Sequence, residues 1–513
     1  MPLPTLCRVV ILLVLAIFVH GAEAMNPTTQ RWLAEREALR KDRQHLVQGA
    51  AADRKVRAEK AAKIFGEILV KTAENRQPGQ DEALHRLLAG LRSIDPAPFV
   101  GCSEQIAALP SPPTAADPKL AKAWSKLLED KRLQMTRPSE LLGQKALQKN
   151  VLSIAHECLE QVLAIAPDHA GLRKGLRQVK IDGRWYGPRE QEIARSGLRW
   201  DDKLGWILAK ERERYANGAY YDFTTKNWTT MAQADADHAN RARQWVIQTE
   251  HLEIRGTARL ADLVDVANRI EAFYDRIFGV YSGFFAGRKG QVNDVQLIFG
   301  MLDHPRLVLN VARDKEDYAH SLPAGVEAGW SDGMFIPGAG ASYFYAGPTE
   351  VVYHEFTHQV LRQFTGTDSA PVWAVEGVAV YSQVPEFHDG RMVLGRMAGN
   401  SHLRHHLDLL QEGKHMPIAE LLDLESHAAW SRSDDPGRQY AAAGMFVQFC
   451  MESENRRWRE DFIDYLREAY RGESDGRKVW LYLGIERSAL EEAYTVWQTA
   501  TAANPPSPIH KGE

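Results

Sequence analysis

The chain has 513 residues, of which 44% are apolar and 25% are charged, and its formal net charge is -4. This composition is typical of globular proteins, and the length predicts at least two units with hydrophobic cores, which excludes a chain that is mainly disordered. Lysines and arginines are scattered among the acids, so the sequence gives no basic block that would indicate a nucleic-acid partner.

The first 24 residues have the pattern of a secretory signal peptide. An apolar run of 11 residues at 9–19 is followed by Ala22, Glu23 and Ala24, which match the small-x-small rule for cleavage after Ala24. An uncleaved membrane anchor is the alternative, but the run is too short to span a bilayer as a helix. We therefore expect a secreted or periplasmic protein with no stable membrane span.

Residues 25–190 are expected to form an all-α N-terminal region. The charged, helix-rich stretch at 28–93 predicts a hairpin or a helical layer, and four prolines within 109–118 predict a break between helices. Residues 145–180 resemble one tetratricopeptide-type hairpin. Because a solenoid needs about three such repeats, we interpret the region as a helical spacer, which could also bind a protein partner.

Residues 191–505 have a different pattern, followed by a short tail at 506–513. Short β-rich runs come first, and a helix with apolar residues every three or four positions separates the first two of them. Helical patterns then continue almost to the end. The sequence therefore predicts an α+β domain with a mixed sheet lobe and a helical lobe. The expected strands are at 251–256, 295–299, 306–311 and within 333–347, and the expected helices are at 372–384, 398–412, 416–424, 438–453, 457–471 and 486–500.

The junction of the two lobes carries the sequence VVYHEFTHQVL at 351–361. A helix that begins near Thr349 and ends at Gly366 places His354 and His358 on one face, where two imidazoles can bind one ion such as zinc. Glu355 is rotated away from the histidines, so its carboxylate lies beside the open position of that ion. Glu355 is the expected general base.

A third ligand is expected from a second apolar helix. Glu376 lies 18 residues after His358 among valines and a tryptophan, and a buried carboxylate needs a cation. A structural salt bridge to Arg362 or Arg391 is the alternative to a metal ion. Gly377, which has no side chain, would let the second helix approach the first closely.

HEFTH followed by WAVEG resembles the gluzincin group of zinc metallopeptidases, in particular the peptidase-MA-like domains of secreted bacterial proteins that often follow helical regions. The resemblance covers residues 245–500. The metzincin pattern would need glycine and histidine where Leu361 and Phe364 stand, so that branch is excluded.

The resemblance implies a zincin-like fold with His354, His358 and Glu376 as Zn²⁺ ligands and Glu355 as base and proton shuttle. It also implies an upstream strand edge that pairs with the substrate backbone, and residues 333–347 are similar to that edge.

Two parts of the site are less defined by the resemblance. Related enzymes often carry an aspartate four residues after the ligand glutamate to orient a histidine, but Val380 stands there, so the partner of the histidines is unidentified. The family usually supplies a tyrosine or histidine to stabilise the oxyanion. Tyr440 is our candidate, and an aromatic packing residue is the alternative.

The function that the resemblance implies is that of a secreted zinc-dependent metallopeptidase, in which a zinc-bound water activated by Glu355 hydrolyses peptide bonds. The first alternative is a non-catalytic peptide-binding or cell-envelope scaffold that retains a zincin fold. Retention of Glu355 favours catalysis, because a purely structural zinc prefers four protein ligands and has no use for a base. The second alternative is an accidental motif, against which the buried Glu376 argues.

Overall fold

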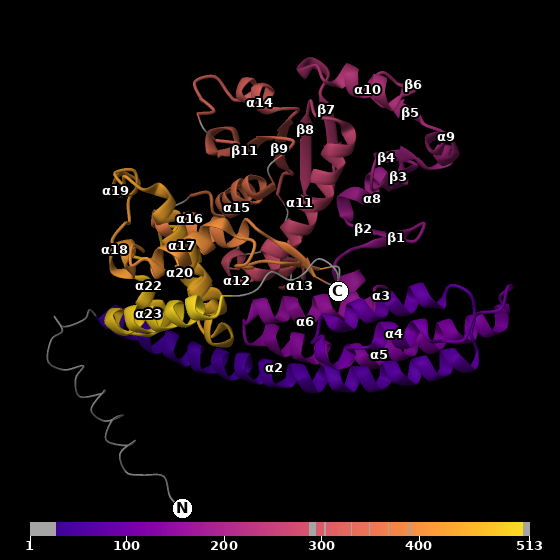
Figure 1. Cartoon of the computed structure of the whole chain (residues 1–513), viewed down its shortest axis with the longest axis horizontal. Coiled ribbons are helices and arrows are strands. Elements are labelled where there is room, and N and C mark those ends of the chain that lie inside the picture. The colour runs from indigo at the N-terminus through magenta and orange to yellow at the C-terminus, as the bar shows by residue number, and fades with distance from the viewer. Residues whose placement is uncertain are drawn as a thin grey trace, which may run out of the picture.

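The computed structural model describes residues 27–286, 294–301, 304–329, 331–347, 349–367, 369–388 and 391–505. The expected signal peptide and the tail at 506–513 lie outside these ranges. The protein is an α+β structure in which long N-terminal helices lie beneath a part that combines a small mixed sheet with many helices (Figure 1). The predicted α+β class and helical N-terminal region are confirmed. None of the helices in the described ranges combines the length and apolar composition that crossing a bilayer requires.

The N-terminal region begins with one long helix. α2 (Pro27–Glu74) has 48 residues and passes through Gly49 and Gly66 without a break, because a lone glycine weakens a helix by only about 1 kcal/mol. The turn of the hairpin expected within 28–93 comes after α2, where the chain continues as α3, which contacts α2. The remaining helices of the region are α3 (Gln80–Arg92), α4 (Cys102–Ala107), α5 (Pro118–Gln148), α6 (Leu152–Ile165) and α7 (Ala170–Gly175).

The break at the proline-rich segment 109–118 is confirmed, since α4 ends before it and Asp117 accepts hydrogen bonds from the first backbone N–H groups of α5. The stretch at 145–180 differs from the expected two-helix hairpin. α6 packs against α5, while α7 has only six residues. The second arm of the expected hairpin is therefore only a short turn of helix.

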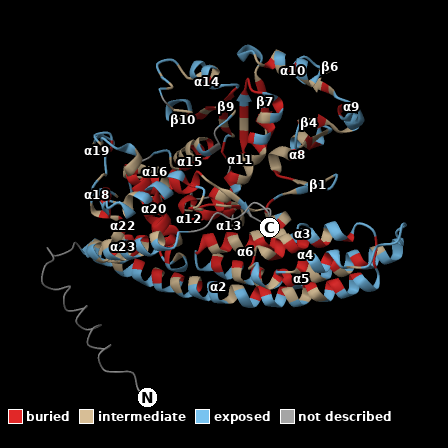
Figure 2. Cartoon of the chain, viewed as in Figure 1, coloured by how far each residue is buried: buried red, intermediate tan, exposed pale blue. Residues whose placement is uncertain are grey.

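Buried ion pairs attach α2 to the C-terminal helix α21 (Arg459–Tyr470). Arg43 Nη1 lies 2.5 Å from Asp464 Oδ2, Arg36 Nη2 lies 3.0 Å from the same oxygen, and Arg40 Nε lies 3.3 Å from Asp461 Oδ2. The exposure of these five side chains is at most 9%. A helix with little apolar surface is thus held by guanidinium–carboxylate pairs along its buried face (Figure 2).

Residues 179–230, all of them described, form three antiparallel two-stranded hairpins, each followed by a short helix. They connect the N-terminal helices to the larger sheet. The hairpins are β1 (Val179–Ile181) with β2 (Arg184–Tyr186), β3 (Leu198–Asp201) with β4 (Gly205–Leu208), and β5 (Ala219–Asp222) with β6 (Asn227–Thr230), and the helices are α8 (Pro188–Arg195), α9 (Arg212–Ala216) and α10 (Met231–His238).

The larger sheet of the described residues has five strands in the order β10-β11-β9-β8-β7. The three inner strands are parallel, and both edge strands run antiparallel to their neighbours. β10 is therefore an edge strand within 333–347, the segment expected to form such an edge, and in the sequence β11 lies between it and the helix that carries HEFTH. The strands are β7 (Trp245–Gln248), β8 (Leu252–Gly256), β9 (Leu307–Ala312), β10 (Gly333–Ile336) and β11 (Ala341–Tyr345).

One expected strand is wrong. Residues 295–299 belong largely to the short helix α13 (Asp294–Ile298), which packs against α6. A short apolar run fits a buried strand or a buried helix equally well, so periodicity could not distinguish them. The expected helix between the first two runs is α11 (Leu260–Val280), which connects β8 to the next part of the chain.

The C-terminal part is helical, as expected, apart from one small hairpin. That hairpin joins β12 (Glu386–His388) and β13 (Arg391–Val393). The helices are α15 (Thr349–Thr365), α16 (Val372–Ser382), α17 (Ser401–Gln411), α18 (Ile418–Leu422), α19 (His427–Trp430), α20 (Pro436–Arg456), α21, α22 (Val479–Leu483) and α23 (Arg487–Ala503).

Two glycines allow α16 and α20 to pack at close range. A Cβ at Gly377 would lie 2.6 Å from the carbonyl oxygen of Ala443, and a Cβ at Gly444 would overlap Val380. The expectation that Gly377 brings α16 close to α15 is therefore wrong, because the glycine faces α20. This contact fixes α20, and with it Tyr440, relative to Glu376.

Replacing Gly377 by alanine should lower the free energy of unfolding by about 1–3 kcal/mol, because the new methyl group overpacks the contact with Ala443. Urea denaturation measures this change. Gly49→Ala is the matched control: it is also helical but has nothing within 4 Å of the added Cβ, so it should be neutral or stabilising by up to about 1 kcal/mol. Equal stability of Gly377→Ala and the wild type would contradict the packing argument.

Glu160 on α6 connects the N-terminal helices to the rest of the chain. Its carboxylate pairs with Arg276 of α11 at 2.8 Å and also with Arg391 of β13. Burial alone raises the pKa of Glu160, but the two guanidinium groups outweigh this effect and lower the pKa to about 2. An unfolded glutamate has a pKa near 4.3, so the pair stabilises the fold above that pH and loses its effect as the pH falls towards 2.

Glu160→Gln should therefore lower the free energy of unfolding at pH 7 by roughly 2–3 kcal/mol. The difference from the wild type should shrink as the pH is lowered from about 4 towards about 2, measured by urea denaturation at each pH. Glu59→Gln, in an exposed pair with Lys55, should change stability by less than about 0.5 kcal/mol. A Glu160→Gln deficit that stays constant with pH would refute the assigned ionisation.

Candidate metal centre

The helix that carries the HExxH motif forms as the sequence predicts. α15 ends at Gly366, whose φ of +79° is the left-handed conformation that glycine adopts without strain. Phe356 and Val360 are fully buried on one side of the helix. With that side fixed in the core, His354 and His358 face α16.

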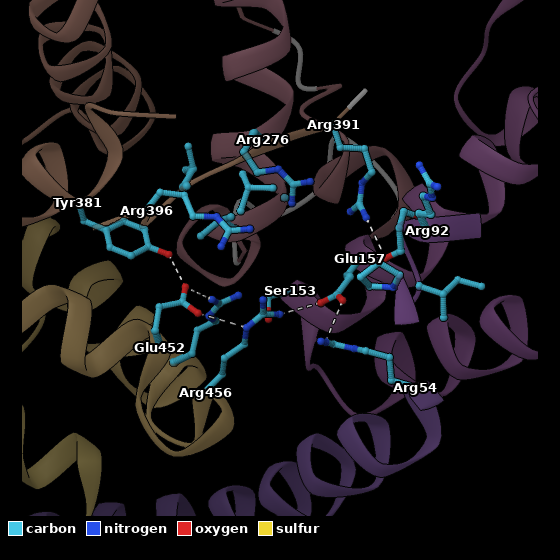
Figure 3. A pocket seen from close by; sticks show the side chains of 18 residues that line it. Arg54, Arg92, Ser153, Glu157, Arg276, Tyr381, Arg391, Arg396, Glu452 and Arg456 are labelled. Atoms are coloured by element: carbon cyan, nitrogen blue, oxygen red, sulfur yellow. Dashed lines mark hydrogen bonds and ion pairs between the residues drawn. The ribbon is translucent and has the colours of Figure 1, made fainter. Parts of the chain in front are cut away.

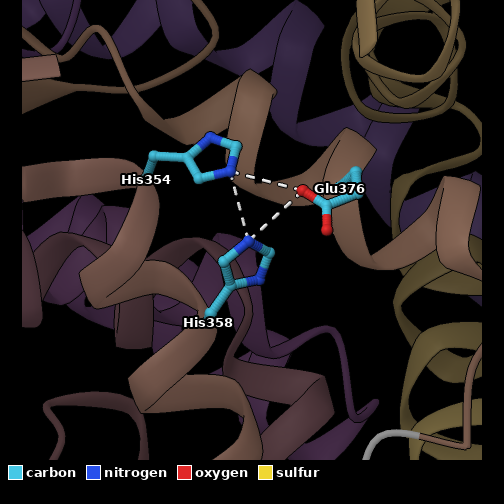
Figure 4. A group of neighbouring side chains, drawn as sticks. All are labelled: His354, His358 and Glu376. Atoms are coloured by element: carbon cyan, nitrogen blue, oxygen red, sulfur yellow. Dashed lines mark hydrogen bonds and ion pairs between the residues drawn. The ribbon is translucent and has the colours of Figure 1, made fainter. Parts of the chain in front are cut away.

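The structure brings all three expected ligands together (Figure 4). The Nε2 atoms of His354 and His358 lie 3.2 Å apart, and Glu376 Oε2 lies 3.3 Å and 3.4 Å from them. In a regular tetrahedron the centre lies about 0.61 edge lengths from each corner, so these edges correspond to metal–ligand distances of about 2.0 Å, which match zinc. The donor set and its spacing therefore fit a zinc ion with one coordination position left for solvent.

The two imidazoles dominate the electrostatic surroundings of Glu376. Burial raises the pKa of Glu376, but the neighbouring His358 and hydrogen bonds from both imidazoles outweigh it and hold the pKa well below its usual range. The carboxylate is thus ionised and 15% exposed. The alternative ion pair with Arg391 is wrong, because that side chain pairs with Glu160.

Gln383 supplies the histidine partner that the sequence did not identify. Its Oε1 lies 3.1 Å from His354 Nδ1, and the residue is only 4% exposed. With the amide oxygen as acceptor, Nδ1 keeps a proton, so a metal ion that displaced the Nε2 proton would find the Nε2 lone pair directed at the centre. Gln383 follows Glu376 by seven residues, two helical turns, which is the signal that could have located it. Val380, where an aspartate was expected, is buried against Gly444.

Glu355 is held by the edge of the sheet. Its Oε2 accepts a hydrogen bond of 2.7 Å from the backbone N–H of Phe335 in β10. The carboxylate of the expected base therefore lies between the HExxH helix and the edge strand. An extended chain that paired with β10 would lie next to this carboxylate.

Tyr440 lies beside the three ligands, at the start of α20. Its ring centroid is 6.3 Å from that of His354. Burial raises the pKa of Tyr440, and the carboxylates of Glu376 and Glu355 raise it further, so the phenol keeps its proton and can donate a hydrogen bond. It also packs against Trp430 at 5.5 Å, so both roles considered for Tyr440 are compatible with its position.

His402 on α17 is a site residue that the sequence did not indicate. Its ring centroid lies 5.8 Å from that of Tyr440. Burial, together with the imidazoles of His354 and His405, lowers the pKa of His402, so its ring is neutral at pH 7. No motif connects His402 to the HExxH helix, and only the packing of α17 against α20 brings it there.

Comparisons with protein-family models, with curated proteins and with solved structures found no match to this chain. Interpretation of the site therefore depends on the geometry described above and on the motif.

Gln383→Leu should weaken zinc binding by about 10–100-fold, because His354 loses the acceptor that fixes its tautomer and ring orientation. Competition with a chromophoric chelator at pH 7 measures the affinity. Gln383→Glu keeps an acceptor at the same place and should bind zinc at least as tightly as the wild type. Wild-type affinity in Gln383→Leu would show that the 3.1 Å contact does not orient the ligand.

Proposed function

We propose that this protein is a zinc-dependent metallopeptidase of the gluzincin type with a zincin-like catalytic domain. The observation that carries the proposal is the near-equilateral arrangement of His354 Nε2, His358 Nε2 and Glu376 Oε2, with separations of 3.2–3.4 Å. Two consecutive helices, α15 and α16, supply these atoms. The chemistry that zinc supplies in such a centre is Lewis acidity, which polarises a carbonyl group and lowers the pKa of water towards 7.

The protein side chains would divide the remaining work. Glu355 accepts a proton from the attacking water and later gives it to the leaving amine, and its hydrogen bond from Phe335 N–H keeps it at the mouth of the centre. Tyr440 is the candidate donor to the developing oxyanion, and the neutral His402 beside it is a second.

The substrate is proposed to be a peptide or protein in extended conformation. β10 is an edge strand of the described sheet, and Glu355 lies against it, so a peptide added to this edge would pass the reactive groups. We further propose that the protein acts outside the cytoplasm, which is supported by the signal-peptide pattern at 1–24. The N-terminal helices would then serve as a spacer or as a docking arm for a protein partner.

Glu355→Gln should retain zinc at one ion per chain but lose at least about 100-fold in the hydrolysis of a mixed peptide library, because only the base is removed. His358→Ala should lose both the metal and the activity. Metal analysis and mass spectrometry of the digested library give the two readouts.

Glu350→Gln is the control on the same helix, because this glutamate is exposed and outside the centre. It should behave as the wild type in both assays. Unchanged hydrolysis by Glu355→Gln would refute the enzyme proposal, and retention of zinc with no hydrolysis by the wild type would favour the non-catalytic scaffold.

A further inference from the structure

A polar cavity lies between the N-terminal helices and the C-terminal part of the chain (Figure 3). It has a volume of about 280 Å³. Arg54 of α2 and Arg92 of α3 line it from the N-terminal side, and Tyr381 of α16 lines it from the other side. It is separate from the metal centre, whose ligands do not line it.

Seven of the eighteen residues that line the cavity are arginines. Besides Arg54 and Arg92, five further guanidinium groups come from α11, the β13 segment and the α20–α21 junction. They are Arg276, Arg391, Arg396, Arg456 and Arg459. Such a concentration of guanidinium groups from elements far apart in the sequence is costly, because like charges in a partly desolvated space repel one another.

The carboxylates of the described residues do not balance these charges. Glu157 pairs with Arg54 at 3.1 Å and with Arg456 at 2.8 Å. Glu452 pairs with Arg456 at 3.4 Å and also with Arg459. Glu160 takes Arg276 and Arg391. Even without Arg92, and with the more distant Glu386 near Arg396 included, six arginines face four carboxylates, which leaves two positive charges in excess.

Several nitrogen atoms at the cavity also lack hydrogen-bond acceptors. The Nε atoms of Arg54, Arg391 and Arg396 are buried and have no acceptor among the described residues. The nearest carboxylate to Arg396 is that of Glu386, at 3.9 Å, which is too long for a hydrogen bond. A buried donor without an acceptor is destabilising, and an anion in the cavity would supply the missing acceptors.

The backbone is strained where it brings one of these arginines to the cavity. Glu454, Asn455 and Arg456 have φ values of +46°, +56° and +69°, the left-handed region that residues with a side chain rarely adopt in succession. Each such residue destabilises the fold, and strain of this kind concentrates at ligand sites. The strained turn places the Arg456 guanidinium between Glu157 and Glu452.

We propose that this cavity binds a small, multiply charged anion that carries phosphate or carboxylate groups. Guanidinium groups present paired N–H donors that match both kinds of oxyanion. Since one water needs at most about 30 Å³, a volume of 280 Å³ accommodates an anion such as pyrophosphate or citrate. The bound anion contacts both α2 and the C-terminal part of the chain, and so stabilises their association. This inference does not depend on the proposed peptidase activity.

Isothermal titration calorimetry of the full chain with pyrophosphate, and separately with citrate, tests the proposal at low ionic strength. Arg396→Gln removes a guanidinium group without breaking a close ion pair, and should weaken binding at least about tenfold. Arg396→Lys keeps the charge, so its affinity for the probe should lie between those of the wild type and Arg396→Gln. Arg487→Gln is the control, because its side chain is 35% exposed against 39% for Arg396 and lies outside the cavity. It should bind as the wild type.

Arg54→Gln serves as a second variant if thermal melting shows that Arg396→Gln is unfolded. Binding of one probe supports the proposal and identifies the class of the ligand as phosphate-bearing or carboxylate-bearing, and binding of both supports a general oxyanion site. Chelation of a metal ion by the probes would be equal in the wild type and the variants, so it cannot mimic the expected loss. Absence of binding of either probe to the wild type, or equal affinity in all variants, would overturn the proposal.

Discussion

The site depends on the close approach of one carboxylate and two imidazoles. Glu376 Oε2 and the two Nε2 atoms are all within 3.4 Å of one another, in a place where each side chain is only about 15% exposed. Lone pairs at such distances repel unless a cation lies between them or the imidazoles are protonated, and partial burial strengthens the repulsion. The divalent ion that we propose would resolve this conflict and would leave a position for solvent beside Glu355.

Three features of the fold hold the carboxylate and the imidazoles in this arrangement. Gly366 ends α15 and lets the chain return along it as α16, so that both helices present residues to one point. Gly377 and Gly444 allow α20 to approach α16, which brings the ring of Tyr440 to 6.3 Å from that of His354. Ion pairs add to apolar burial in the attachment of the N-terminal helices, where Arg43 of α2 pairs with Asp464 and Leu46 joins the main hydrophobic core. Arg54, further along α2, lines the cavity for which an anion is proposed.

The sequence was sufficient to predict which three side chains come together and insufficient to predict their surroundings. His354, His358 and Glu376 could be identified because helical periodicity places i and i+4 on one face and because a carboxylate among valines needs a partner. Gln383 and the partner of Gly377 could not be identified, since both depend on which helix packs against which. The strand expected at 295–299 failed for a related reason: in a short apolar run, the tertiary neighbours decide between helix and strand.

The central claim is that one metal ion is bound by three side chains from α15 and α16. The most direct measurement is a crystal structure of the zinc-treated protein with anomalous diffraction data collected on both sides of the zinc absorption edge. Our account predicts one anomalous peak about 2.0–2.2 Å from His354 Nε2, His358 Nε2 and a carboxylate oxygen of Glu376, with at least one further position filled by solvent. A fully ordered site without such a peak, or a peak bound by other residues while Glu376 points elsewhere, would contradict it.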